Sequence, residues 1–552
     1  MGERVNVGEE TVRVVGFFAG SVIDSAFEVT IQPFGITQVT SGAPAPVTAR
    51  GRWAAGEAAV ATRGRKYRPS VPLPPEFRAA IGRALPAEAL VTEPAECRTY
   101  ECDALTGHRA IPELVAIPGS AEDVQEVVKL CHAHRVPFVA RGAGTGLSGG
   151  ALPVADGVVI SLARLNRIIE VDLDSRRVVV EPGVTNLAIT KAVAADGFYY
   201  APDPSSQQVC TIGGNVAENS GGAHCLKHGF TVNHVLAADV VLADGELVTL
   251  SRDDDGPDLL GVFVGSEGTL GIAVRITVGI LRAPETVRTL LAGFETLDAG
   301  GDAVSHVLAA GILPAAIEMM DALTIEAVEA AVAAGYPKGA GAVLIVELDG
   351  PAAQVAEESA AVEAICRERG AFELHAAETA DERARIWLGR KSSFASMGRI
   401  ASSYYVQDGV VPRTRLPEVL RRTTELSREY GLRVASVFHA GDGNLHPLVL
   451  YDEAVEGEAE RAERLATAIL DACIDVGGSL TGEHGVGVDK ACSMPKLFSE
   501  RDLEAMQLLR AGFDPDGLAN PGKVFPSPRL CGEVPGPYRT HPLERAGLAE
   551  RF

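Results

Sequence analysis

Four short loop motifs, three of them rich in glycine, constrain the fold of this chain more than any other feature. Arg141–Gly150 follows a β-like run, Ala201–Ser206 is a rigid turn ending in two hydroxyls, and Thr211–Gly222 and Gly265–Ile272 follow. Glycine lets a backbone approach a ligand closely and turn successive N–H groups toward it, which suits a pyrophosphate. One such loop is as compatible with a plain turn as with a binding site. Four of them in one domain indicate a ligand site.

The first loop differs from the dinucleotide fingerprint of a Rossmann unit. That motif reads G-x-G-x-x-G and opens a helix. Here the loop leads to Val158, which opens another β-like run. The sequence therefore predicts a cofactor-binding domain of a different topology.

Alternating β-like runs and amphipathic segments predict an α+β chain of more than one domain. Short strands and helices alternate up to about Arg282, and Pro284 marks a boundary. Strand–helix–strand units follow, then a hairpin, a long helix from about Glu458 to Asp475, and a polar glycine-rich loop. We expect a poorly ordered N-terminal extension (residues 1–75), two domains (76–284 and 285–526) and a C-terminal tail (527–552).

Composition excludes several classes of function. The chain has 552 residues and a formal net charge of −23, which argues against nucleic acid or anionic lipid as the main partner. No apolar run approaches the roughly 20 residues of a membrane span, and no secretory signal is visible, so a cytoplasmic location is expected. The nine cysteines include no Cys-x-x-Cys pair, which makes an iron–sulfur cluster, a zinc knot or a disulfide framework unexpected.

Two histidines and a carboxylate form the second group of candidate site residues. A turn at Gly441–Asn444 would bring His439 and His446 together at the mouth of a hairpin. Spacing alone fits half of a metal site as well as it fits two structural histidines. Glu483, in the loop after the long helix, could add a carboxylate and leave positions open for substrate. His484 would then be a neutral imidazole free to accept a proton.

The order and the sequences of the four loops resemble those of the flavin-binding domain of the vanillyl-alcohol oxidase (PCMH-type) family. In that family the first loop holds the FAD pyrophosphate and the later loops line the isoalloxazine. Some members attach FAD through a histidine in the first loop, but Arg141–Gly150 contains neither histidine nor cysteine, so non-covalent FAD is expected. The resemblance places FAD on Arg141, Gly142, Ala143, Gly144, Thr145, Gly146, Leu147, Ser148, Ser205, Ser206, Gly213, Gly214, Asn219, Gly221, Gly222, Glu267, Gly268 and Ile272.

Further motifs resemble the 2-hydroxy-acid dehydrogenase branch of this family, which includes the D subunits of bacterial glycolate oxidase. They are the histidine hairpin, the Glu483 loop, Trp387–Lys391, Tyr404–Arg413 and Phe513–Lys523, and the similarity runs from about residue 88 to the C-terminus. The resemblance implies a second, substrate-binding α+β (cap) domain and a C-terminal segment that returns to the flavin.

The same resemblance implies a role for each candidate residue. A divalent, zinc-like metal on His439, His446 and Glu483 would bind the substrate oxygens, and His484 would take the hydroxyl proton. Arg390 would hold the substrate carboxylate, although without the resemblance an ordinary helix-surface arginine would be the simpler interpretation. Asn520 would contact the flavin.

Two apolar positions narrow the expected substrate. Relatives that act on 2-hydroxyglutarate place polar residues where this chain has Phe394 and Val406, so a second carboxylate would lack a partner here. A small monocarboxylate, glycolate or D-lactate, fits better. The expected function is FAD-dependent oxidation of a small 2-hydroxy acid by the catalytic subunit of a glycolate oxidase complex. A stand-alone D-lactate dehydrogenase and a non-catalytic electron-relay subunit are the alternatives.

The cysteine pattern also bears on partners. Without cluster-type cysteines the chain has no evident route for electrons beyond its flavin. An iron–sulfur subunit and a second flavin-fold subunit are therefore expected, and any association with the membrane would run through them.

Overall fold

The computed structural model describes residues 11–13, 26–32, 35–42, 66–68 and 72–526. Most of the predicted N-terminal extension and the whole predicted tail lie outside the described residues, so the prediction that residues 1–75 are poorly ordered stays a prediction. Helix α1 (Pro75–Ala84) begins where that extension was expected to end. It buries Phe77 and Ile81 against the apolar core of the first domain.

A small four-stranded sheet carries the first glycine loop. Its strands, in the spatial order β5-β7-β9-β8, are β5 (Leu90–Val91), β7 (Leu114–Ala116), β9 (Val158–Ser161) and β8 (Phe138–Arg141). Strands β7 and β8 both pair parallel to β9, and helix α3 (Ala121–His134) connects β7 to β8. The Ser120 hydroxyl accepts the Asp123 N–H at 3.1 Å and caps the N-terminus of α3. The 141–151 loop therefore leaves the end of a buried parallel strand.

A five-stranded antiparallel sheet carries the other cofactor loops. Its strands, in spatial order, are β10 (Ile168–Asp172), β11 (Arg177–Val180), β15 (Ile272–Gly279), β13 (Val235–Val241) and β14 (Leu247–Ser251). Strands β13 and β14 form a hairpin around Asp244-Gly245, where Gly245 has a φ of +86°. The long connection from β11 to β13 contains the segments 201–206 and 211–222.

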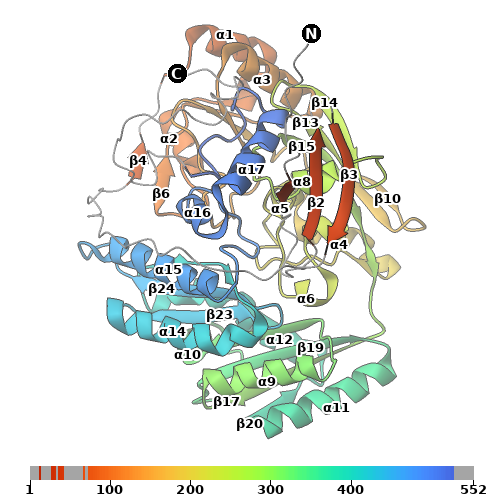
Figure 1. The fold of residues 1–552 in the computed structure, drawn as a ribbon, viewed down its shortest axis with the longest axis vertical. Helices are drawn as coiled ribbons and strands as arrows, with labels where there is room; N and C mark the ends of the chain where they lie inside the picture. The colour runs from red at the N-terminus through yellow and green to blue at the C-terminus, as the bar shows by residue number, and fades with distance from the viewer. Residues whose placement is uncertain (1–10, 14–25, 33–34, 43–65, 69–71, 527–552) are drawn as a thin grey trace, which may run out of the picture.

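An eight-stranded antiparallel sheet forms the other half of the molecule, the lower half in Figure 1. Its strands, in spatial order, are β20 (Ala371–Ala376), β17 (Thr286–Phe294), β19 (Ala342–Gly350), β18 (Ala316–Asp321), β23 (Val434–His439), β24 (Asn444–Tyr451) and β21 (Ser403–Val406), and β22 (Gly409–Val410) also pairs with β24. Both faces are covered, so strand β19 is buried along almost its entire length, and its first five residues, Ala342–Val346, are all apolar.

Helices on the two faces of this sheet form separate cores. One face packs against α9 (Leu297–Ala309), α11 (Ala352–Glu368), α14 (Leu416–Tyr430) and α15 (Glu458–Asp475). The other face packs against α10 (Ala322–Val332), α12 (Ala380–Lys391) and α13 (Ser393–Ser396). The predicted bounds of the long helix, Glu458 to Asp475, are confirmed.

Strand β24 carries His446. It begins at Asn444 and pairs with β23 on one side and with β22 and β21 on the other. The extra pairing places His446 inside a central strand rather than in a loop, which fixes its direction.

The C-terminal segment returns to the first half of the molecule, as the resemblance implied. Helices α16 (Met494–Leu497) and α17 (Glu500–Phe513) lie beside the upper half in Figure 1. Beyond them the Phe138 N–H donates to the Leu518 carbonyl at 2.9 Å and the Asn520 N–H donates to the Phe138 carbonyl at 2.8 Å. The segment around Leu518–Asn520 is thereby attached to β8, next to the first glycine loop.

The remaining helices and strands are short. They are β1 (Thr11–Arg13), β2 (Ala26–Gln32), β3 (Gly35–Gly42), β4 (Lys66–Arg68), β6 (His108–Ala110), β12 (Phe198–Tyr199), β16 (Leu281–Arg282), α2 (Pro94–Cys97), α4 (Asn186–Val193), α5 (Ile212–Glu218), α6 (Cys225–His228), α7 (Thr231–His234) and α8 (Leu259–Phe263). Within the described part of the chain, no helix is both long enough and apolar enough to cross a bilayer.

Candidate active site

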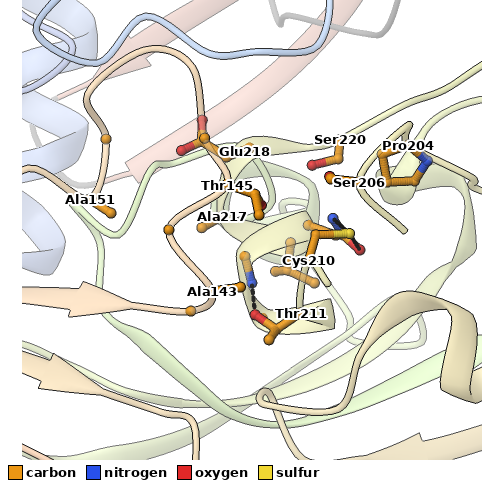
Figure 2. A pocket seen from close by; sticks show the side chains of 18 of the residues that line it. Ala143, Thr145, Ala151, Pro204, Ser206, Cys210, Thr211, Ala217, Glu218 and Ser220 are labelled. Atoms are coloured by element: carbon orange, nitrogen blue, oxygen red, sulfur yellow. Dashed lines mark hydrogen bonds between the residues drawn. The ribbon is translucent and has the colours of Figure 1, made fainter. Parts of the chain in front are cut away.

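A cavity of about 440 Å³ runs along the four predicted loops and ends at the histidine hairpin. That volume is in the range of cofactor and ligand sites. In Figure 2 the loop that carries Ala143 and Thr145 lies on one side, and Pro204 and Ser206 lie on the other. The predicted FAD residues that border the cavity are Arg141, Gly142, Ala143, Gly144, Thr145, Gly146, Leu147, Ser205, Ser206, Gly213, Gly214, Glu267, Gly268 and Ile272.

Two of these glycines are required by close packing. Gly144 has a φ of +71°, and a Cβ there would lie 2.3 Å from a guanidinium nitrogen of Arg141. A Cβ on Gly213 would lie 2.6 Å from the Pro182 side chain. The left-handed φ of Gly144 and the contact of Gly213 with Pro182 disfavour any larger residue, so these glycines fit a site in which backbone faces a ligand.

Five of the predicted FAD residues do not border the cavity, and they support its walls instead. They are Ser148, Asn219, Gly221, Gly222 and Asn520. The Ser148 carbonyl accepts the Val488 N–H, and the Asn219 side chain accepts the Val232 N–H. The Asn520 amide donates to the carbonyls of Gly150 and Glu267 at 2.9 and 2.6 Å. Asn520 therefore joins two cofactor loops, and the expected contact with the flavin stays a prediction.

Several cavity residues were missed from the sequence. They include Pro182, Pro204, Cys210, Thr211, Asn215, Ala217, Glu218, Ser220, Phe263 and Ser266. Most of them lie inside the predicted loop segments. The loop motifs therefore indicated the right parts of the chain but not these individual residues. Burial raises the pKa of Glu218 well above its usual value, and the neighbouring carboxylates of Glu267 and Asp103 raise it further. Figure 2 shows the Glu218 side chain in the cavity wall.

The predicted metal ligands converge at the end of the cavity. His439 is the last residue of β23, His446 lies on β24, and their rings are 5.1 Å apart. The Glu483 Oε1 lies 3.1 Å from the Nε2 of His439 and 3.2 Å from the Nε2 of His446. Ligand atoms of all three residues lie within 4.8 Å of one another, so these residues could hold one divalent cation.

The charges around His439 favour a cation. Burial alone would lower the pKa of His439, but the carboxylates of Glu318 and Glu483 raise it well above its usual value. The two histidines in turn hold the pKa of Glu483 well below its usual value, against the effect of burial. Positive charge at this point is thus stabilised by buried carboxylates, as a metal site requires.

A single carboxylate organises the loop that carries Glu483 and His484. The Asp408 Oδ2 accepts the backbone N–H groups of Gly482, Glu483 and His484 at 2.8 to 3.1 Å and the Thr481 hydroxyl at 2.6 Å. Burial opposes ionisation of Asp408, but His484, Lys490 and His446 hold its pKa well below the usual value. The loop conformation is therefore set by its contact with a segment more than 70 residues earlier.

His484 stacks on His446 and stays neutral. Their ring centroids are 4.8 Å apart with an angle of 12° between the planes. Burial lowers the pKa of His484 to about 4, and the charge of Asp408 opposes this only in part. A neutral imidazole at the cavity wall can accept a proton.

Arg390 is buried on α12 and borders the cavity, which contradicts the interpretation as a helix-surface arginine. Only 4% of its side chain is exposed, and its Nε donates to the Glu318 Oε2 at 2.6 Å. Phe394 and Tyr404 also border the cavity, and Phe394 packs edge-on against His446 with 6.1 Å between the ring centroids. Val406 does not border the cavity; it is buried in the apolar core against which Phe394 and Tyr404 also pack.

The cysteines are mostly buried small side chains, as expected. Cys97, Cys131, Cys210, Cys225, Cys366 and Cys473 are free and buried, and Cys102 is free and partly exposed. Cys492 is disulfide-bonded, which the sequence did not indicate.

Comparisons with known proteins agree with this geometry. Residues 112–251 match the family described as "FAD binding domain", and residues 283–524 match "FAD linked oxidases, C-terminal domain". The chain is 47% identical over 457 residues to glycolate oxidase subunit GlcD of Escherichia coli (strain K12), covering 82% of this chain and 92% of that protein. It is 38% identical to GlcD of Bacillus subtilis (77% and 92% covered) and 32% identical to D-lactate dehydrogenase of Archaeoglobus fulgidus (77% and 95% covered).

Solved structures show the same fold at low sequence identity. 4-Ethylphenol oxidase from Gulosibacter chungangensis aligns with a TM-score of 0.70 at 18% identity, covering 84% of this chain and 100% of that one. p-Cresol methylhydroxylase aligns with a TM-score of 0.69 at 18% identity, covering 81% and 96%. The predicted PCMH-type α+β fold is confirmed. The chain is an FAD-dependent oxidoreductase, and it belongs to the family of FAD-linked oxidases that contains glycolate oxidase subunit GlcD.

Proposed function

We propose that this protein oxidises a small 2-hydroxy acid, glycolate or D-lactate, to the corresponding 2-oxo acid as the catalytic subunit of a glycolate oxidase complex. One observation carries the proposal. Two imidazole nitrogens and one carboxylate oxygen converge at the end of the flavin cavity, beside a buried arginine and a neutral imidazole. These residues can bind both the carboxylate and the hydroxyl group of a 2-hydroxy acid, and the neutral imidazole can accept the hydroxyl proton. A subunit that only relays electrons has no use for it.

The cofactors fit the residues that are present. The loops that face the cavity suit FAD, and the three donors with carboxylate-supported charge suit a divalent, zinc-like metal on His439, His446 and Glu483. Bound FAD supplies the acceptor for the hydride from the α-carbon, and a bound metal supplies Lewis acidity at the substrate oxygens.

The protein side chains account for orientation and proton transfer. Arg390 is placed to bind the substrate carboxylate in a charge-assisted pair, because its guanidinium borders the cavity. A ring nitrogen of His484 accepts the proton of the 2-hydroxyl group, since the imidazole is neutral. Phe394 and Tyr404 narrow the cavity beside His446 and exclude water from it.

Partner subunits follow from the same proposal. The GlcD relatives are named as subunits. We propose that electrons leave the flavin through an iron–sulfur subunit and that a second flavin-fold subunit completes the complex. This chain is then cytoplasmic, and any association with the membrane runs through those partner subunits.

Substrate size provides the test of the proposed reaction. We expect glycolate or D-lactate to exceed D-2-hydroxyglutarate in kcat/KM by at least about tenfold, because Phe394 offers no partner for a second carboxylate. Steady-state rates with an artificial dye acceptor measure this. Equal or better turnover of the diacid would contradict it. A D-lactate value well above that of glycolate would favour the D-lactate dehydrogenase alternative.

The mode of FAD attachment is tested separately. We expect acid precipitation of the yellow protein to release all flavin into the supernatant. The first loop lacks histidine and cysteine, and Cys210, the free thiol that borders the cavity, has its pKa raised by burial and is therefore a poor nucleophile. Absorbance of the supernatant and of the redissolved pellet measures the partition, and flavin retained by the pellet would show a covalent bond.

A further inference from the structure

Glu318 connects two parts of the active site that are far apart in sequence. It lies on β18 and is completely buried. Its Oε1 lies 2.7 Å from the Nδ1 of His439, and its Oε2 accepts the Nε–H of Arg390 at 2.6 Å. One carboxylate therefore contacts both a candidate metal ligand and the candidate substrate arginine.

We propose that Glu318 is a positioning residue that sets the tautomer of His439 and the direction of Arg390 together. The inference rests on the proposed function and deepens it. It states that metal binding and recognition of the substrate carboxylate depend on the same buried side chain.

For His439, Glu318 determines which of the two ring nitrogens carries the hydrogen. A carboxylate accepts hydrogen bonds, so Glu318 keeps a hydrogen on Nδ1. The Nε2 atom, which faces Glu483 at 3.1 Å, is then free to ligate a cation. A partner that instead donates to Nδ1 would favour the tautomer with hydrogen on Nε2, which cannot ligate.

The argument for Arg390 concerns its direction. Glu318 occupies the Nε–H, which fixes the plane of the guanidinium at the cavity wall. Arg390 is on α12, whereas Glu318 and His439 are on adjacent strands of the sheet. Glu318 thus sets the distance between the arginine and the metal ligands, and a 2-hydroxy acid must match that distance with its carboxylate and hydroxyl groups.

The chain offers a matched control in Glu347. This glutamate lies on β19 of the same sheet, is 2% exposed, and also holds α12, through Trp387 Nε1 at 2.6 Å and Arg383 Nε at 3.1 Å. Its side chain also contacts His224 and Thr289, and these four partners include neither a candidate ligand nor Arg390. Glu347→Gln therefore perturbs the same helix without touching the proposed linkage.

The test compares Glu318→Gln with Glu347→Gln in the full-length, FAD-loaded protein. The amide introduced by Glu318→Gln can accept from only one of the two donors and turns an NH₂ group toward the other. We expect Zn²⁺ affinity, measured by competition with a chelator, to fall about 10–100-fold in Glu318→Gln and to stay at the wild-type value in Glu347→Gln. KM for glycolate should also rise in Glu318→Gln, with FAD content and Tm equal to those of the control.

A double-mutant cycle tests the linkage to the arginine. Arg390→Lys keeps the positive charge and should raise KM while leaving Zn²⁺ affinity unchanged. Its effect on KM should be smaller in the Glu318→Gln background, because the arginine is already misdirected there. If Glu318→Gln fails to retain FAD, Glu318→Asp, whose shorter side chain cannot reach both partners, replaces it.

The outcomes that overturn the inference are distinct from failure of the proposed function. Wild-type Zn²⁺ affinity in the Glu318 variants, or equal losses in Glu347→Gln, would show that Glu318 has only a structural role, even if glycolate is oxidised. A wild-type protein that binds no divalent metal would overturn the proposed metal site and this inference with it.

Discussion

Replacing Glu483 with alanine should remove the bound metal and glycolate turnover together, while FAD stays in place. Glu483 is the one carboxylate among the described residues that faces the Nε2 atoms of both His439 and His446. Loss of a residue that merely orients a ligand costs about 10–100-fold in metal affinity, so loss of a ligand should cost at least as much. Metal analysis of the purified protein, flavin absorbance and dye-linked turnover measure the three quantities. His446→Ala should behave in the same way.

Asp442→Asn is the matched control for this experiment. Asp442 is a carboxylate in the turn of the same hairpin, and its side chain accepts the Asn444 N–H at 3.1 Å without joining the group of candidate ligands. It should keep metal and flavin. A Glu483→Ala protein with full metal content and full rate would mean that the histidines and Glu483 are structural polar residues.

Replacing His484 with alanine should lower kcat by about 10²–10⁴-fold while metal and FAD remain bound. The imidazole is neutral and borders the cavity, so its loss removes the proton acceptor without removing one of the three converging ligand atoms. KM for glycolate should change little, because Arg390 is untouched. Anaerobic bleaching of the flavin by glycolate in a single turnover measures the chemical step directly.

Metal analysis of the His484 variant separates the two roles in this loop. If the metal is lost with the rate, the second possible ligand group of the structure, Asp408, His446 and His484, holds the ion instead. If kcat is unchanged, another group accepts the proton. Glu483 and His484 are adjacent, so only this pair of variants distinguishes the ligand from the base.

The loops could be predicted as a ligand site from local sequence because close approach of the backbone requires glycine, and the resemblance to PCMH-type flavoproteins implied that the ligand is FAD. Gly144 and Gly213 are glycines since a Cβ would collide with Arg141 or Pro182, and that requirement is visible as a motif. The cap at Ser120 and the helix Glu458–Asp475 follow from local capping and amphipathic spacing. The convergence of His439, His446 and Glu483 was also expected, since a hairpin brings two of them together.

Residues whose role depends on contacts with parts of the chain far away in the sequence could not be identified from local motifs. Asp408 reads as an ordinary polar residue, yet it binds three successive N–H groups of the Glu483 loop. Val406 was expected to narrow the substrate site, but the structure buries it in the core and places Tyr404 at the cavity. Asn520, expected at the flavin, instead joins two loops.

The sequence by itself determined the fold class, the cofactor loops and the set of reactive side chains, because glycine requirements and ligand types are properties of individual residues and short spacings. The tertiary structure alone decided which buried carboxylates orient those side chains. Glu318 is 121 residues from His439 and 72 from Arg390, and pairing of β18 with β23 and packing of α12 on the sheet bring the three together. A hydrogen bond depends on distances of a few tenths of an ångström, and only the packed core fixes these across such separations.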